Sequence, residues 1–201
     1  MTAYKDLMAF QRETEALGQI AGRLGWDQET VMPEGATPQR AEEHAAMANI
    51  LHARRIAPQV GDWLAKAEAT TDVEAANLRH IKRSFERTAK VPAALASELA
   101  RTTSLAHRTW AQARADEDVA SFLPILQKVV DLRKEEASAI AGNADPYDAL
   151  LDDYEPGATG ESIAAMFASL RPRLVALRAA ILDQAPPAAL SGTFDDEAQL
   201  A

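Results

Sequence analysis

Apolar residues recur at alternating spacings of three and four along most of this 201-residue chain, which is the pattern of amphipathic α-helices. The first such stripe, over residues 3–26, carries Leu7, Phe10, Leu17 and Leu24. Alanine, the best helix former, supplies 43 of the residues, and runs of Val, Ile and aromatic residues that favour strands are missing. The sequence therefore predicts an all-α protein with about seven or eight helices and no sheet.

Prolines, glycines and capping residues divide this pattern into segments. We predict helices at 3–26, 37–54, 57–69, 71–90, 93–115, 121–142, 146–153 and 159–183. Thr71 and Glu74 have the spacing of a capping box, and Ser121 is the predicted cap of the helix that contains Pro124. Pro172 is expected to kink or interrupt the last helix. No repeat or linker divides the chain, so we expect a single helical segment over 1–201, with residues 185–201 irregular.

Composition excludes several classes of function. The chain has no cysteine, which excludes disulfides, a cysteine nucleophile and zinc–thiolate sites. Its net charge is −9 and it has no block of basic residues, so we expect neither a nucleic-acid nor a membrane partner. It has no long apolar run, and its first residues are charged, so neither a membrane span nor a secretory signal is predicted. We expect a cytoplasmic protein.

The histidines do not form a familiar metal motif. Helical zinc proteases carry two histidines four residues apart, because that spacing places both imidazoles on one face. His44, His52, His80 and His107 include no such pair. We interpret all four as surface or packing residues.

An acidic cluster follows the sixth predicted helix. Its five carboxylates belong to Asp145, Asp148, Asp152, Asp153 and Glu155. Because hard cations prefer oxygen ligands, the cluster is compatible with a Ca²⁺ or Mg²⁺ site. The alternative is structural: Asp145 caps a helix, and the other acids lie in its first turn or on a solvated face.

A second concentration of polar groups lies near residue 26. Trp26, Asp27, Gln28 and Glu29 place an aromatic ring, an amide and two carboxylates in succession. Two carboxylates can form an acid–base pair. Alternatively, Trp26 is a core anchor and the carboxylates bind neighbouring groups. We expect Trp26 to be largely buried, and at least one of the carboxylates to accept a hydrogen bond from a backbone N–H or a basic side chain.

Three stretches carry a resemblance to a known family. Residues 24–30 read LGWDQET and are followed by Met32, Pro33 and Gly35. Residues 113–116 and 122–132 read ARAD and FLPILQKVVDL, and residues 147–157 read YDALLDDYEPG. In this order and spacing they resemble the N-terminal part of the carboxypeptidase Taq family of metallocarboxypeptidases. The similarity covers nearly the whole chain.

This resemblance implies an all-helical, zincin-like fold and a cytosolic homodimer that removes residues one at a time from peptide C-termini. It implies a divalent metal, zinc or else cobalt or manganese, held by an H-E-x-x-H motif and a downstream glutamate. The family-signature residues present in this chain would line the substrate groove or form scaffold. They are Trp26, Asp27, Gln28, Glu29, Tyr147, Asp148, Asp152, Tyr154 and Glu155.

The chain departs from the family because its 201 residues contain no H-E-x-x-H motif. Family members are about 500 residues long, so we expect an N-terminal portion of such an enzyme. No catalytic residue, metal ligand or cofactor is assigned to this chain, which is expected to be inactive alone. Two alternatives are a helical interaction or regulatory module derived from the family, and a stand-alone bundle that binds cations through carboxylates.

Overall fold

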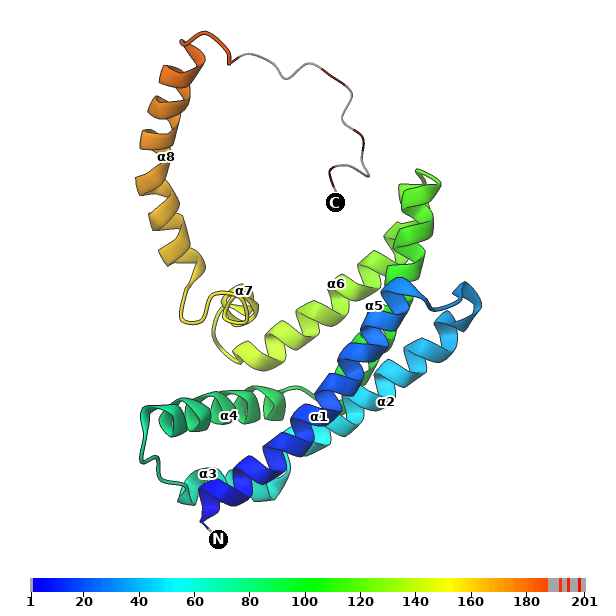
Figure 1. Cartoon of the computed structure of the whole chain (residues 1–201), viewed down its shortest axis with the longest axis vertical. Helices are drawn as coiled ribbons and strands as arrows, with labels where there is room; N and C mark the ends of the chain where they lie inside the picture. The colour runs from blue at the N-terminus through cyan, green and yellow to red at the C-terminus, as the bar shows by residue number, and fades with distance from the viewer. Residues whose placement is uncertain (1, 188–191, 193–194, 196–198, 200–201) are drawn as a thin grey trace. The chain divides into compact units, whose positions relative to one another are not determined.

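The structure, a computed structural model, describes residues 2–187, 192, 195 and 199. These residues form helices and no β-strand, which confirms the all-α prediction. The elements in chain order are α1 (Ala3–Thr30), η1 (Glu34–Ala36), α2 (Thr37–Arg55), α3 (Pro58–Lys66), α4 (Asp72–Lys90), α5 (Ala93–Ala115), α6 (Val119–Ala141), α7 (Pro146–Leu151) and α8 (Gly160–Leu182). Figure 1 labels these eight α-helices. None of the described helices has both the length and the apolar character needed to cross a membrane.

Local side-chain chemistry explains most helix ends. The Thr71 side chain accepts a hydrogen bond from the Glu74 N–H at 3.2 Å and caps α4, which is one half of the predicted capping box. The Glu74 carboxylate accepts the N–H and the hydroxyl of Thr70 instead. The cap of α6 is Asp118 and not Ser121, because the Asp118 carboxylate accepts the Ser121 N–H at 3.2 Å. Pro172 does not interrupt α8, which is one helix from Gly160 to Leu182.

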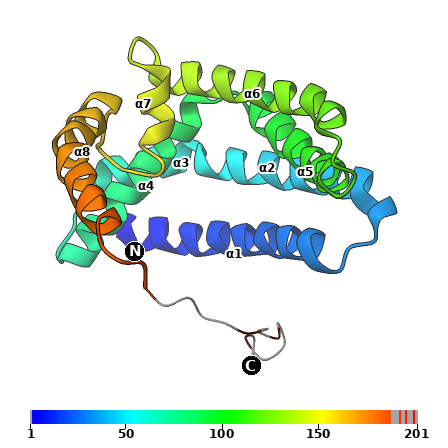
Figure 2. The same ribbon diagram turned by 90° about the horizontal axis from the view of Figure 1, so that it is seen from above.

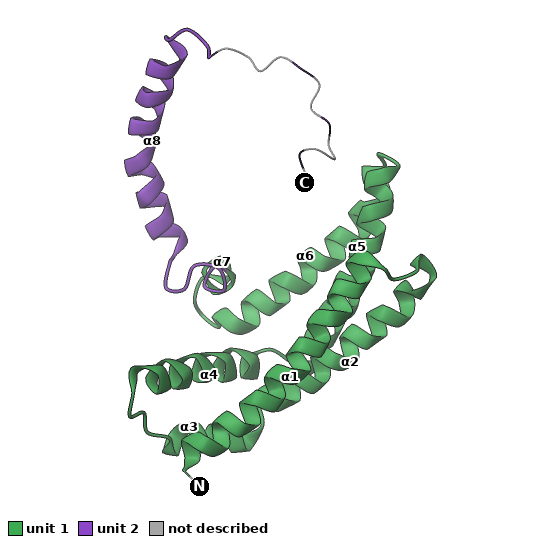
Figure 3. Ribbon diagram, in the orientation of Figure 1, with its two compact units in different colours: residues 1–150 green, residues 151–201 purple. Residues whose placement is uncertain are grey.

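The described residues form two compact units, residues 1–150 and 151–201 (Figure 3). The first unit contains α1 to α6 and nearly all of α7. The second contains α8 and the turns before it. No boundary was visible in the sequence, and the single segment over 1–201 stays a prediction. The predicted irregular segment 185–201 lies mostly outside the described residues.

The core of the first unit depends on small side chains between α2 and α5. In this unit α2 contacts both α1 and α5, and α5 in turn contacts α6 (Figure 2). Ala41 and Ala45 of α2 are buried, and the buried Ser97 of α5 donates its hydroxyl to the backbone oxygen of Ala45 at 3.3 Å. A side chain reaches this oxygen on a neighbouring helix only where the two helices pack closely. This packing fixes the separation of α2 and α5.

Enlarging one of these alanines should destabilise the fold. We expect Ala45→Leu to lower the free energy of unfolding by about 1–3 kcal/mol, because a well-packed interface cannot accept the extra volume. Urea unfolding followed by circular dichroism measures the loss. Ala46→Leu is the matched control, since Ala46 is exposed on the same helix. Equal stability of the two variants would contradict this account of the interface.

Candidate functional site

Residues 26–29, here called the tryptophan motif, lie in the last turns of α1. This helix continues to Thr30 and does not end at Trp26 as predicted. Successive residues of an α-helix point about 100° apart. Asp27, Gln28 and Glu29 therefore leave α1 in different directions. Each of them meets a different partner on α2 or α5.

Arg40 binds the first of these side chains from the start of α2. Its Nη2 lies 2.5 Å from Asp27 Oδ2, and its Nη1 donates to the backbone oxygen of Leu24. Its Nε donates to Glu43 at 2.8 Å. The hydrogen bond to Asp27 is the largest cause of the raised pKa of Arg40, and burial opposes it. With 11% of its side chain exposed, Arg40 joins the end of α1 to α2 through a charged fork.

Gln28 and Glu29 bind α5. The Ser104 hydroxyl donates to Gln28 Oε1 at 2.6 Å, and Gln28 Nε2 donates to the backbone oxygen of Ser104 at 3.4 Å. Glu29 Oε2 lies 2.7 Å from His107 Nε2, one turn further along α5. The expected hydrogen bond from a basic side chain to a carboxylate of the motif is present at Asp27, which accepts it from Arg40.

Trp26 is not buried, which corrects the expectation from the sequence: 63% of it is exposed. Its backbone oxygen accepts a hydrogen bond from the Thr30 hydroxyl at 2.7 Å. The exposed indole is therefore on the outer face of α1. The motif thus holds a large aromatic side chain outward on an anchored helix end.

Two hollows share three residues of this region, Gln28, Glu29 and His107. The smaller, of about 190 Å³, is also lined by Glu34 and Arg108, which form an ion pair at 2.6 Å. The larger, of about 380 Å³, extends over α5 toward α6. The remaining residues that line it are Gly25, His44, Leu99, Ala100, Thr103, Ser104 and Arg133. The region offers imidazole, amide, hydroxyl and guanidinium groups to a small polar ligand.

His44, which lines the larger hollow, has a lowered pKa. Burial is the main cause that lowers the pKa of His44, and the positive charge of Arg40 lowers it further, while Glu43 acts in the opposite direction. The neutral imidazole is therefore favoured in the folded state.

The stretch 147–157, which carries the other family-signature residues, lies on other elements. Tyr147 and Asp148 belong to α7, whose Ala149 backbone oxygen accepts a hydrogen bond from Arg87 of α4 at 2.9 Å. Asp152, Tyr154 and Glu155 follow in the second unit, where Asp152 Oδ1 accepts the N–H of Gly157 at 2.9 Å. Tyr147 and Tyr154 are both exposed. The contacts of the tryptophan motif with α2 and α5 involve none of these residues.

The family resemblance implies a metal but assigns none of its ligands to this chain. Among the described residues, no three His, Asp or Glu side chains are grouped so that they could hold a metal ion. The acidic cluster at 145–155 includes Asp145, which accepts the Tyr147 N–H at 2.7 Å as a helix-capping group. His52 is buried, and its Nε2 lies 2.6 Å from the backbone oxygen of Val91. We derive no catalytic step through a metal from this chain.

Sequence reasoning did not identify Arg40, Ser104 and His107 as partners of the motif, nor Arg108 as the partner of Glu34. One signal was available on the predicted helix 93–115: Ser104, His107 and Arg108 are spaced three and four residues apart and share a face. The pairing of Ser104 and His107 with α1, and of Arg108 with Glu34, could not be seen, because it depends on how the helices pack.

Arg40 can be tested by a substitution that keeps its charge. We expect Arg40→Lys to lower the free energy of unfolding by about 2 kcal/mol, because an ammonium group cannot bind Asp27, Glu43 and the Leu24 carbonyl at once. Thermal and urea unfolding measure the change. Arg23→Lys, at an exposed position of α1, should have almost no effect. If both variants unfold alike, Arg40 is not the link that we describe.

His44 should make stability depend on pH. Its folded-state pKa lies below its unfolded value, so the unfolded chain binds more protons once the pH falls below about 6.5. Stability is then lost as the pH falls through this window. Between about pH 7 and about pH 5, His44→Gln should lose less stability than the natural chain. His80→Gln, which replaces an exposed imidazole, is the control, and it should follow the natural chain.

The relatives found among known proteins are named carboxypeptidases. The chain is 38% identical over 195 residues to thermostable carboxypeptidase 1 of Thermus thermophilus, and the match covers 90% of this chain and 38% of that protein. It is 31% identical over 183 residues to thermostable carboxypeptidase 1 of Pyrococcus furiosus, and this match covers 90% of this chain and 37% of that protein. The chain therefore spans less than half the length of these relatives.

Solved structures similar to this chain are also carboxypeptidases. The Pyrococcus furiosus carboxypeptidase, described as Apo-Mg, is 30% identical with a TM-score of 0.73, over 91% of this chain and 37% of the other. The M32 carboxypeptidase of Deinococcus radiodurans R1 is 30% identical with a TM-score of 0.73, over 98% of this chain and 41% of the other. The family profile of the carboxypeptidase Taq (M32) metallopeptidases matches residues 6–201. With a match over nearly its full length, this chain belongs to the carboxypeptidase Taq (M32) metallopeptidase family.

Proposed function

We propose that this chain is the N-terminal helical portion of a metal-dependent carboxypeptidase that removes residues from peptide C-termini. The observation that carries the proposal is the family match over residues 6–201, together with relatives named carboxypeptidases of which the chain spans 38% and 37%. Zinc is the metal that we propose for the whole enzyme, with cobalt or manganese as alternatives. We propose a cytoplasmic homodimer that acts on peptides and binds neither nucleic acid nor membranes.

In this proposal the tryptophan motif forms scaffold for one wall of the substrate groove. Asp27, Gln28 and Glu29 use their polar groups to hold the end of α1 on α2 and α5. Anchoring of this kind keeps the two hollows beside His107 in a fixed shape. Trp26 remains free to contact substrate or another part of the enzyme.

The metal would be held outside the part of the chain that the structure describes, because no suitable group of ligands occurs among those residues. A catalytic zinc usually needs three protein ligands and an open position. We therefore propose that the chain alone does not hydrolyse peptides. Metal, when bound in the whole enzyme, would supply a Lewis acid and an activated water.

A chimaera tests the proposal. Residues 6–201 would replace the matching segment of the Thermus thermophilus relative, and release of C-terminal amino acids from peptides would be measured with zinc, cobalt and manganese. We expect the chimaera to release amino acids in a metal-dependent way, and the isolated chain to release none. The unaltered relative is the positive control.

Two results would contradict the proposal. One is a chimaera that is helical and unfolds cooperatively but releases no amino acid, which would favour a derived interaction module. The other is metal-dependent release by the isolated chain that survives purification and is abolished by a point substitution within it.

A further inference from the structure

Helix α8 carries an apolar stripe that the described part of its own unit leaves uncovered. The stripe consists of Ile163, Phe167, Leu170, Leu174, Leu177 and Ile181, spaced alternately by four and three residues. This is the spacing of a helix that packs along its length against another helix. Leu170 is 43% exposed and Ile181 is 60% exposed. Continuous apolar surface of this extent marks an interaction site.

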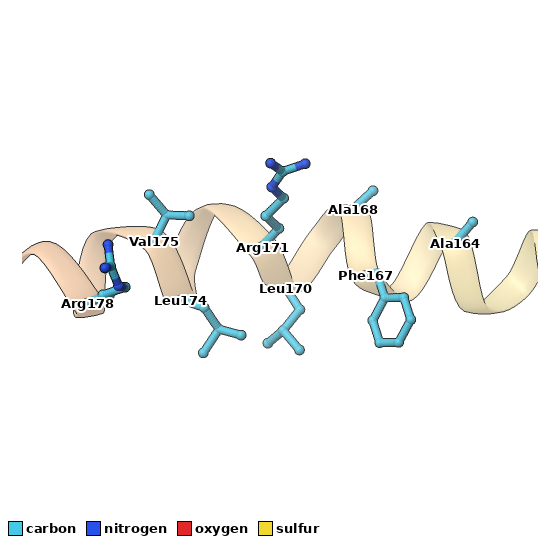
Figure 4. Close-up of a pocket in the computed structure, with 8 residues that line it drawn as sticks. All are labelled: Ala164, Phe167, Ala168, Leu170, Arg171, Leu174, Val175 and Arg178. Atoms are coloured by element: carbon cyan, nitrogen blue, oxygen red, sulfur yellow. The ribbon is translucent and has the colours of Figure 1, made fainter. Parts of the chain in front are cut away.

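Figure 4 shows one side of this helix in close-up. Phe167, Leu170 and Leu174 extend from the same side of α8, whereas Arg171 leaves in another direction. All eight residues labelled there line an open hollow, and all belong to α8.

The charges along the stripe have one sign. At about 100° per residue, Arg171 and Arg178 lie about 60–80° to one side of its centre, and Arg173 lies about 80° to the other side. The acidic residue of the helix, Glu161, lies almost opposite the stripe. Among the described residues these three arginines take part in no salt bridge. Both edges of the apolar face are thus basic, in a chain whose net charge is −9.

A second copy of α8 is a poor occupant of this face. In a parallel or an antiparallel pair the arginines at the edges face arginines, and like charges at such positions reject a partner. An amphipathic helix with Asp or Glu along both edges of its apolar face would instead form ion pairs on each side while covering the stripe.

We infer that the α8 stripe receives an amphipathic helix with acidic edges, supplied by the part of an M32 protein beyond the length that this chain spans. The inference rests on the proposed function, because it takes the occupant from the same enzyme. It adds the chemistry of the contact: an apolar seam with basic edges on α8 and acidic edges on the partner. Homodimers of the whole enzyme would then use another surface.

Two sets of peptides test this with the chain as it stands. Two synthetic helical peptides share one leucine–alanine seam, and one has Glu at both edges while the other has Lys. Overlapping 25-residue peptides, about seven helical turns each, cover the segment of the Thermus thermophilus relative that this chain does not match. Binding is measured by fluorescence anisotropy.

We expect the Glu-edged peptide to bind at least about tenfold more tightly than the Lys-edged peptide. The double variant Arg171→Glu/Arg173→Glu should reverse this preference. Its control, Arg12→Glu/Arg23→Glu, makes the same charge change at exposed positions of α1 and should keep the natural preference. Leu174→Gln should weaken binding of the Glu-edged peptide about tenfold, whereas Leu182→Gln, away from the stripe, should not. From the relative, the peptides that bind should have an apolar stripe with acidic edges.

Four outcomes would overturn the inference. They are failure of the Glu-edged peptide to bind, equal binding of the two designed peptides, failure of every peptide from the relative to bind, and sedimentation showing a dimer that Leu174→Gln converts to a monomer. Protection of the stripe from hydrogen exchange in the chain alone, together with absent peptide binding, would identify this chain's own residues as the occupant. The chimaera can be active in any of these cases, so the inference and the proposed function fail separately.

Discussion

Close packing of α2 against α5 is the constraint on which the first unit depends. Alanines on α2 and a serine on α5 fill their contact, and the serine hydroxyl reaches a backbone oxygen of the facing helix. This separation decides which residues of α5 stand opposite the end of α1. With a larger side chain at the contact, Ser104 and His107 would move away from Gln28 and Glu29, and the hollows between them would change shape.

The residues that follow Trp26 connect the end of α1 to two other helices. Asp27 binds Arg40 of α2, and Gln28 and Glu29 bind Ser104 and His107 of α5. The end of α1 is therefore held at several points. The exposed indole of Trp26 is the group that this helix end presents outward.

The positions of most helices could be predicted because caps, prolines and apolar spacing act over a few residues. The predicted range 93–115 coincides with α5. Errors occurred where two local signals competed. Asp118 caps α6 in place of Ser121, because an ionised carboxylate is the stronger acceptor at a helix N-terminus. At Pro172, where a kink or a break was expected, α8 is not broken.

By itself the sequence determined the helical class, most helix ends, the absence of a zinc-protease histidine pair and the resemblance to a metallocarboxypeptidase family. These depend on the spacing of residues close together in the chain. Only the tertiary structure decided that Asp27 pairs with Arg40, that Glu29 meets His107 across 78 positions, and that Trp26 faces outward. Helix periodicity shows which residues share a face, but the face that becomes buried depends on which neighbouring helix packs there.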